Sequence, residues 1–251
     1  MEEEYQQGYD AIFLKSAIDP YRAPVFRSVL EHLSVYKNPP GHLLDIGCGA
    51  GEFALLCQKM GWTCSGIELS RPAAEFAARQ GIMMFPCDWL GKSGDVVDSV
   101  RQFDVITMIN AFDHMCDPTG VLQRVYQMLK PGGVVVIRVP NATFHLSIRR
   151  VLTFLKAQRQ QTFHLYLYSP STLKNLLNSA GLKTRSIRNS HTGSTPSYAQ
   201  VESDKRLLRR LIWRAGGLGL WCLAQSLYWI TGKQAVWASS FELVATRDEH
   251  G

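Results

Sequence analysis

The sequence has few cysteines and no arrangement of them that suggests a disulfide framework or a metal centre. None of the six belongs to a C-x-x-C pair or is spaced with a histidine for metal binding, and several lie within apolar stretches. Cysteines in this pattern usually serve as small buried hydrophobic residues, in a protein that resides in a reducing compartment. We therefore expect no disulfide scaffold and no metal site.

The chain also lacks an apolar segment that is long enough to span a bilayer. Residues 215–231 are the best candidate, but they number 17 and include three glycines, whereas a spanning helix needs ~20 predominantly apolar residues. Three glutamates follow Met1 in place of a basic and then apolar segment, which is not the pattern of a secretory signal. We expect a cytoplasmic protein that is at most peripheral to the inner face of a membrane.

A basic stripe of the kind that binds nucleic acid is missing as well. The net charge is +6, but the basic residues fall into separate groups at 149–159, 183–188 and 205–210. These groups lack the interleaved aromatic residues of RNA-binding modules, so no nucleic-acid partner is predicted. The 46% of hydrophobic and 19% of charged residues are typical of a folded globular protein.

The most informative segment that is present is a run of alternating glycines at residues 43–53, LLDIGCGAGEF. It predicts a buried strand, a glycine-rich turn and the start of a helix, which together form a nucleotide-type site. A dinucleotide fingerprint would place a glycine at position 52, where the chain has Glu52, and this carboxylate would repel a pyrophosphate at the helix N-terminus. Glu68, 17 positions after Gly51, stands about where a ribose-binding acid is expected. The pattern favours a ligand that has a ribose but no phosphate.

The glycine run resembles the first motif of the class I S-adenosylmethionine-dependent methyltransferases. Further stretches are similar to later motifs of this family: DHMCDP at 113–118, LKPGG at 129–133 and the His164 to Ser169 segment. The small-molecule enzymes of the family, including those of quinone biosynthesis, are the most similar type. The resemblance implies S-adenosyl-L-methionine as the cofactor.

The resemblance and the spacing together give a set of candidate cofactor-binding residues. By resemblance, Asp45 and the glycine loop surround the methionine part of the cofactor, Asp88 receives the adenine amino group and Trp89 packs on the ring. A carboxylate at position 68 suits the ribose diol, because it accepts two hydrogen bonds. The full set is Asp45, Gly47, Cys48, Gly49, Gly51, Phe53, Glu68, Leu69, Asp88, Trp89, Asn110, Ala111 and Phe112.

Strands and helices are predicted to alternate along the chain, which indicates an α/β fold. The expected class is a Rossmann-like, doubly wound, seven-stranded and mostly parallel sheet with an antiparallel last strand, plus helical cap elements. Strands are expected at 42–46, 62–68, 83–85, 103–109, 134–139, 182–189 and 241–246, and helices begin near 52, 72, 118 and 170. We divide the chain into a helical lead-in or cap (1–40), a core (41–191 and 239–251) and an insertion (192–238).

Histidines are the candidate general bases, since transfer to a hydroxyl group requires removal of its proton. His164 and His114 are the first candidates, and His145 follows the fifth strand, where loops that face the acceptor are expected. A structural role for each of these histidines is an equal alternative. No spaced set of carboxylates requires a metal ion.

The insertion contains a hydrophobic and basic segment at 205–232, with Trp213, Trp221 and Trp229 behind four basic residues. This composition suits a helix at a membrane surface, a cap over the active site or a dimer contact, and the oligomeric state stays open.

The function that the residues and the resemblance indicate is O-methylation of a small or lipid-like acceptor. A non-catalytic cofactor-binding scaffold and an RNA or protein methyltransferase are the alternatives. The chain reads Ile109-Asn110-Ala111-Phe112 where an enzyme that methylates base amino groups would have an N-P-P-Y-like motif.

Overall fold

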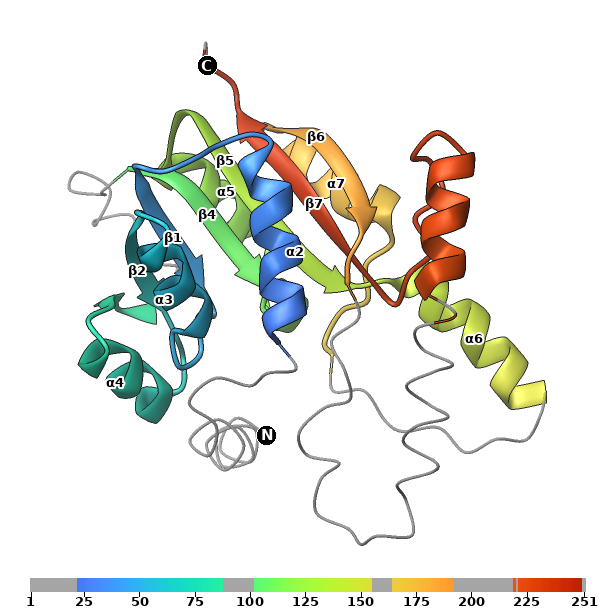
Figure 1. The fold of residues 1–251 in the computed structure, drawn as a ribbon, viewed down its shortest axis with the longest axis horizontal. Coiled ribbons are helices and arrows are strands. Elements are labelled where there is room, and N and C mark those ends of the chain that lie inside the picture. Colours follow the sequence, from blue (N-terminus) through green and yellow to red (C-terminus); the bar gives the residue numbers. More distant parts are fainter. Residues whose placement is uncertain (1–21, 88–101, 155–163, 192–218, 220, 250–251) are drawn as a thin grey trace, which may run out of the picture.

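The structure is a computed structural model that describes residues 22–87, 102–154, 164–191, 219 and 221–249. Within these residues seven strands form one sheet in the order β3-β2-β1-β4-β5-β7-β6 (Figure 1). The strands are β1 (His42–Ile46), β2 (Thr63–Ile67), β3 (Met83–Phe85), β4 (Phe103–Ile109), β5 (Leu129–Pro140), β6 (Leu182–Asn189) and β7 (Ser240–Arg247). Strands β1 to β5 are parallel, and β7 runs antiparallel to both β5 and β6. The predicted fold class is confirmed.

Helices cover both faces of the sheet (Figure 1). They are α2 (Ala23–Ser34), α3 (Glu52–Lys59), α4 (Arg71–Arg79), α5 (Pro118–Met128), α6 (Ala142–Phe154) and α7 (Pro170–Ser179), with the short 3-10 helix η3 (Phe112–His114). Residues 221–230 are also helical. Side chains of α2 and α3 pack on one face, and those of α5 and α7 pack on the other.

The starts of α5 and α7 are specified locally by the sequence. Each has a proline in its first turn, where the missing N–H is not needed. The Asp117 carboxylate accepts a hydrogen bond from the backbone N–H of Gly120 at 3.0 Å, and the Ser169 hydroxyl accepts one from Thr172 at 3.1 Å. These N-caps satisfy backbone donors that would otherwise lack a partner. They fix the residue at which each helix begins.

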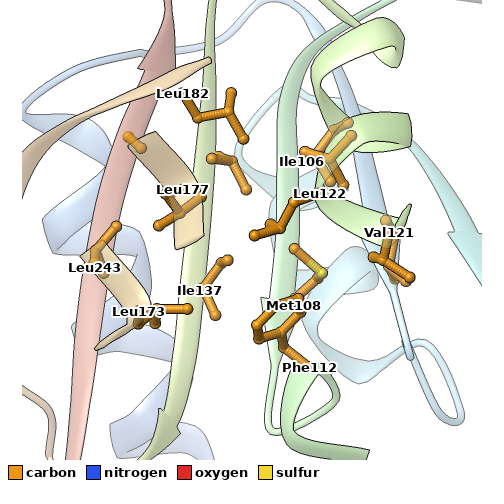
Figure 2. Packing of buried hydrophobic residues seen from close by; sticks show 14 of the residues in the cluster. Ile106, Met108, Phe112, Val121, Leu122, Ile137, Leu173, Leu177, Leu182 and Leu243 are labelled. Carbon is orange, nitrogen blue, oxygen red and sulfur yellow. The ribbon is translucent and has the colours of Figure 1, made fainter. Parts of the chain in front are cut away.

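Apolar side chains of the central strands alternate between two buried clusters, as the two-residue period of a strand requires. Leu44, Ile106, Ile137 and Leu243 face one cluster, and their neighbours Leu43, Val105, Val136 and Val244 face the other. Figure 2 shows Leu122 of α5 and Leu173 and Leu177 of α7 packed against the strand residues of the first cluster. Because both faces of the sheet are covered, the sequences of the central strands are nearly continuous apolar runs.

Three features differ from the sequence prediction or add to it. β5 begins at Leu129, which pairs with Phe103, and the register shifts before Val105 pairs with Val134. The Lys-Pro-Gly-Gly segment, which precedes the strand predicted at 134–139, is therefore an irregular part of β5. Helix α6 was not predicted. No helix in the described ranges is both long and apolar enough to cross a membrane.

Candidate functional site

The glycine loop after β1 adopts a conformation that L-residues with side chains rarely adopt. Gly47, Gly49 and Gly51 all have positive φ angles, of 74°, 56° and 82°. Asn110 and Ala111, directly after β4, form a short segment that we call the β4 loop. At Gly47 the backbone passes so close to this loop that an added Cβ would lie 2.4 Å from the Cβ of Ala111. Glycine is required there for both reasons. The loop and the β4 loop meet at the carboxyl ends of their strands, where open α/β sheets bind ligands.

Glu68 lies directly after β2 and is bound to this loop. One carboxylate oxygen accepts a hydrogen bond from the Gly49 N–H at 2.8 Å, and the other accepts one from the Ser70 N–H at 2.9 Å. Burial raises the pKa of the carboxyl group above its ordinary value, and the backbone hydrogen bonds oppose this rise. A carboxylate has about four acceptor positions, so Glu68 keeps acceptor capacity for a diol ligand.

Asp45, in β1, is buried beneath the glycine loop. Its Oδ1 atom accepts a hydrogen bond from the Thr107 hydroxyl at 2.7 Å. Burial, together with the negative charge of Glu68, raises the pKa of Asp45 to about 7, and the Thr107 hydrogen bond opposes the rise. A cationic ligand group near this carboxyl would favour its ionised form.

The other predicted cofactor residues occupy different environments. The Cys48 thiol faces back towards β2, because a Cβ on Gly66 would lie 2.6 Å from its sulfur. The Phe53 ring is buried 5.5 Å from the ring of Phe26, and Leu69 is exposed. Cys48 and Phe53 therefore support the loop from below. The predicted adenine contacts Asp88 and Trp89 lie outside the described residues.

Asn110 and Ala111 follow β4 at the rim of the same site. Asn110 has a φ of 55°, which is uncommon for a residue with a side chain. Its side-chain oxygen accepts a hydrogen bond from the guanidinium of Arg138, a residue of β5. Phe112 is fully buried, with its ring 5.2 Å from that of Tyr168, so it supports the loop from within the core.

Both first-ranked histidines converge on one buried carboxylate. The Asp113 side chain has no exposed surface, and its Oδ2 atom lies 2.5 Å from Nδ1 of His164 and 3.4 Å from Nε2 of His114. The two imidazole rings are 5.1 Å apart between centroids. Asp113, His114 and His164 thus form a compact acid–base cluster beside the β4 loop, although His164 lies 51 residues after Asp113 in the chain. His145, the third candidate, belongs to α6 rather than to a loop, and its Nε2 atom lies 3.0 Å from the backbone oxygen of Ser239.

Asp113, His114 and His164 also have a donor set that could hold a metal ion, since their ligand atoms lie within 4.8 Å of one another. Two ligands of one ion lie roughly 3 Å apart or more, because each metal–ligand bond is ~2.0–2.2 Å long. The 2.5 Å between Asp113 Oδ2 and His164 Nδ1 is shorter than that. This distance favours a directly hydrogen-bonded pair.

Two buried polar atoms near this cluster have no hydrogen-bond partner within the described part of the chain. They are the second carboxylate oxygen of Asp113 and the hydroxyl of Tyr168. Burial, with the charges of Tyr166 and Asp113, raises the pKa of Tyr168 to about 12. Sequence reasoning did not select Asp113 or Tyr168 as site residues, although both lie in the stretches that resembled family motifs.

The cradle suits S-adenosylmethionine. Its glycines leave the backbone open to a ligand, Glu68 keeps acceptors that would suit a ribose diol, and a cationic methionine part near Asp45 would favour the ionised form of its carboxyl group. The sheet order, with an antiparallel last strand, is that of the class I methyltransferase fold. Residues 19–187 match the family model described as a methyltransferase domain, so the chain belongs to this family of S-adenosylmethionine-dependent methyltransferases.

Several known proteins are similar to the chain. The ubiquinone biosynthesis O-methyltransferase of Thiobacillus denitrificans is 27% identical over 179 residues, which cover 64% of this chain and 73% of the relative. The enzyme of the same name from Pseudomonas putida F1 is 29% identical over 170 residues, covering 64% and 73%. Among solved structures, the magnesium protoporphyrin IX methyltransferase of Synechocystis, with bound SAH, has a TM-score of 0.62 at 11% identity and covers 98% of both chains. A SAM-dependent methyltransferase from Archaeoglobus fulgidus has a TM-score of 0.59 at 17% identity, covering 96% of this chain and 99% of its own. These two structures support the fold.

Proposed function

We propose that the protein transfers the methyl group of S-adenosylmethionine to an oxygen atom of a small, lipid-like acceptor, with His164 as the general base. The observation that carries the proposal is the hydrogen-bonded pair of Asp113 and His164 beside the cofactor-facing β4 loop. When bound, the cofactor supplies an electrophilic methyl group on a sulfonium. The remaining requirements are to place an acceptor oxygen in line with that methyl group and to remove its proton.

The Asp113–His164 pair is arranged for this proton transfer. A buried carboxylate at Nδ1 selects the imidazole tautomer that carries its proton on Nδ1, so the lone pair is on Nε2. His164 keeps about a quarter of its side-chain surface exposed, which leaves the ring accessible to an acceptor. As Nε2 takes the hydroxyl proton, the Asp113 carboxylate stabilises the imidazolium that forms. Asp113 is therefore a positioning residue in this scheme.

His114 is the second base candidate and lies on the other side of the same carboxylate. Burial lowers its pKa below the ordinary value, and the proximity of His164 lowers it further against the opposing charge of Asp113. It is therefore neutral at neutral pH. Because its Nε2 atom lies 3.4 Å from Asp113 Oδ2, its contact with the carboxylate is looser than that of His164.

The lipid-like character of the acceptor is supported by the surface next to the base. Leu165 and Leu167, which flank Tyr166 directly after His164, are 60% and 41% exposed. Exposed leucines beside a polar cluster suit an acceptor that has a polar, reacting end and an apolar remainder. The similar curated proteins named as ubiquinone biosynthesis O-methyltransferases agree with such an acceptor.

We further propose that the helix at 221–230, within the 192–238 insertion, contacts a lipid surface. One of its sides is held to the fold, since Ala224 and Tyr228 are buried and the Tyr228 hydroxyl donates to the Ile187 carbonyl at 3.2 Å. The exposed apolar side chains of this helix are Leu223, Leu227, Trp229 and Ile230.

One basic side chain beside this helix, and a basic group earlier in the sequence, favour an anionic lipid surface as the occupant of its exposed side. The Lys233 ammonium lies 5.0 Å from the centroid of the Trp229 ring, and four basic residues stand at 205–210 in the sequence. Apolar side chains insert into the interface, and basic groups are attracted to anionic headgroups.

The acceptor proposal is tested by incubating the protein with methyl-labelled cofactor and a lipid and quinone extract. We expect label in an organic-soluble product that mass spectrometry identifies as a methyl ether. The Glu68→Ala variant, in which we expect weaker cofactor binding, sets the background. Label only in protein, in RNA or in a water-soluble amine would overturn the proposal.

A further inference from the structure

Arg138 is a buried cation in a strand that is otherwise apolar at this depth. It is 4% exposed, and its neighbours in β5, Ile137 and Val139, are fully buried. All three guanidinium nitrogens donate hydrogen bonds. Nε donates to the Ser190 hydroxyl at 2.7 Å, Nη2 to the His191 carbonyl at 3.1 Å, and Nη1 to the side-chain oxygen of Asn110. Burying a charge is costly, and a hydrophobic side chain would pack there at lower cost. A specific role for the guanidinium is therefore called for.

Asn110 is held by residue 138 in two ways. The side-chain amide oxygen accepts from the guanidinium, and the backbone N–H donates to the Arg138 carbonyl at 2.9 Å. Together these bonds hold a residue with a side chain at a φ of 55°. Asparagine adopts left-handed backbone more readily than most residues with a side chain, but it does so at some cost, and these bonds select that conformation. The next residue, Ala111, is the one whose Cβ meets the Gly47 backbone. The position of Asn110 therefore sets how the β4 loop approaches the glycine loop.

Two buried carboxylates, those of Glu242 and Asp113, balance the charge of Arg138. Glu242 in β7 is fully buried and accepts a hydrogen bond from the Ser190 hydroxyl at 2.9 Å and from Arg188 Nε at 3.0 Å. Burial lowers the pKa of Arg138 to about 10, and the negative charges of Glu242 and Asp113 oppose this. The guanidinium is therefore charged at neutral pH, and it interacts electrostatically with both a structural carboxylate and the carboxylate of the proposed base pair.

We propose that Arg138 is a positioning residue for cofactor binding: it holds Asn110 in the left-handed conformation and so fixes the β4 loop against the glycine loop. This rests on the proposed function only in that the β4 loop faces the cofactor. The same guanidinium binds Ser190 and His191, the last described residues before position 192. The β4 loop and the segment directly after β6 therefore share one anchor.

The test uses the full chain and measures cofactor affinity by calorimetric titration with S-adenosylmethionine. Arg138→Lys keeps the charge but cannot make the three-way contact, so we expect affinity to fall by about tenfold. Asn110→Gly keeps the left-handed conformation accessible but removes the acceptor, and its loss should be similar. The double variant should lose no more cofactor affinity than either single variant, because both substitutions break the same hydrogen bond between residues 110 and 138.

A matched control separates this role from a purely structural one. Arg188→Lys likewise replaces a partly buried guanidinium by an ammonium group, but Arg188 binds Glu242 and not Asn110. It should lower the melting temperature without changing cofactor affinity. Wild-type affinity in Arg138→Lys and Asn110→Gly, or fully additive losses in the double variant, would overturn the inference. Since the readout is cofactor affinity, it is independent of whether an O-methyl acceptor is found.

Discussion

The Nδ1 atom of His164 lies 2.5 Å from the Oδ2 atom of Asp113, and the Asp113 side chain is entirely buried. The geometry makes a clear prediction for Asp113→Asn. An amide keeps the size of the side chain but can present its N–H₂ to Nδ1, which would place the imidazole proton on Nε2. The turnover number should then fall by a factor on the order of 10²–10⁴, the usual contribution of a general base. Steady-state kinetics check this, with cofactor affinity measured in parallel and expected to be unchanged. A variant that turns over like the wild type would remove Asp113 from the mechanism.

Glu68 should determine cofactor affinity. Replacing it by alanine removes the acceptors for the ribose diol and also the bond that holds the Gly49 N–H. Hydrogen bonds to a charged group contribute about 1.5–3 kcal/mol each, so we expect affinity to fall by roughly 10- to 100-fold or more. Titration calorimetry measures the loss. Glu75→Gln is the matched control, because Glu75 is an exposed acid on α4 that pairs only with Arg71 among the described contacts. An equal effect of both substitutions would contradict the assignment.

Cofactor binding should release a proton near neutral pH. The pKa of Asp45 is raised to about 7 by burial and by Glu68, so the carboxyl group is partly protonated in the free protein. A cationic ligand favours the carboxylate and lowers this pKa, so cofactor affinity should rise as the pH increases through about 7 and level off above it. Calorimetry in two buffers of different ionisation enthalpy measures the proton count. Proton uptake would contradict the prediction, and Asp45→Asn should abolish the release.

Lipid association should depend on the exposed end of the 221–230 helix. Trp229 and Ile230 are 65% and 80% exposed, so replacing both by serine removes apolar surface without opening the core. Each large side chain contributes about 1.5–3 kcal/mol when it is fully buried, and the partition into anionic vesicles should fall by at least tenfold. Co-sedimentation at low and high salt measures it. Val35→Ser, at an equally exposed site on the α2 side (73%), is the control. Unchanged sedimentation of the double variant would exclude this surface.

The fold and the cofactor loop were predictable because they depend on short-range signals. Short apolar runs located the strands, and β1, β3, β4 and β6 have the predicted bounds. The glycines at alternate positions indicated a turn that requires positive φ, and all three adopt it. Prolines and capping residues similarly marked the starts of α5 and α7.

The acid–base cluster and the Arg138 anchor could be found only in part from the sequence, because they depend on long-range contacts. His114 and His164 were selected one by one from the sequence. The Asp113 carboxylate that joins them is evident only in the fold, which brings His164 next to a residue 51 positions away. Arg138 carries no local signal, since its partners lie 28 and 52 residues away. α6 was missed although a local signal was present, since Asn141 lies directly before the helix and its side-chain oxygen accepts a hydrogen bond from the Thr143 N–H at 3.1 Å.

The measurement that tests the central claim most directly is the single-turnover rate of methyl transfer at saturating cofactor for the wild type, His164→Ala and His114→Ala. If His164 is the base, His164→Ala should bind the cofactor normally but transfer the methyl group on the order of 10²–10⁴ times more slowly. The effect of His114→Ala should be clearly smaller. Equal transfer rates for the wild type and His164→Ala, at equal cofactor occupancy, would contradict the account.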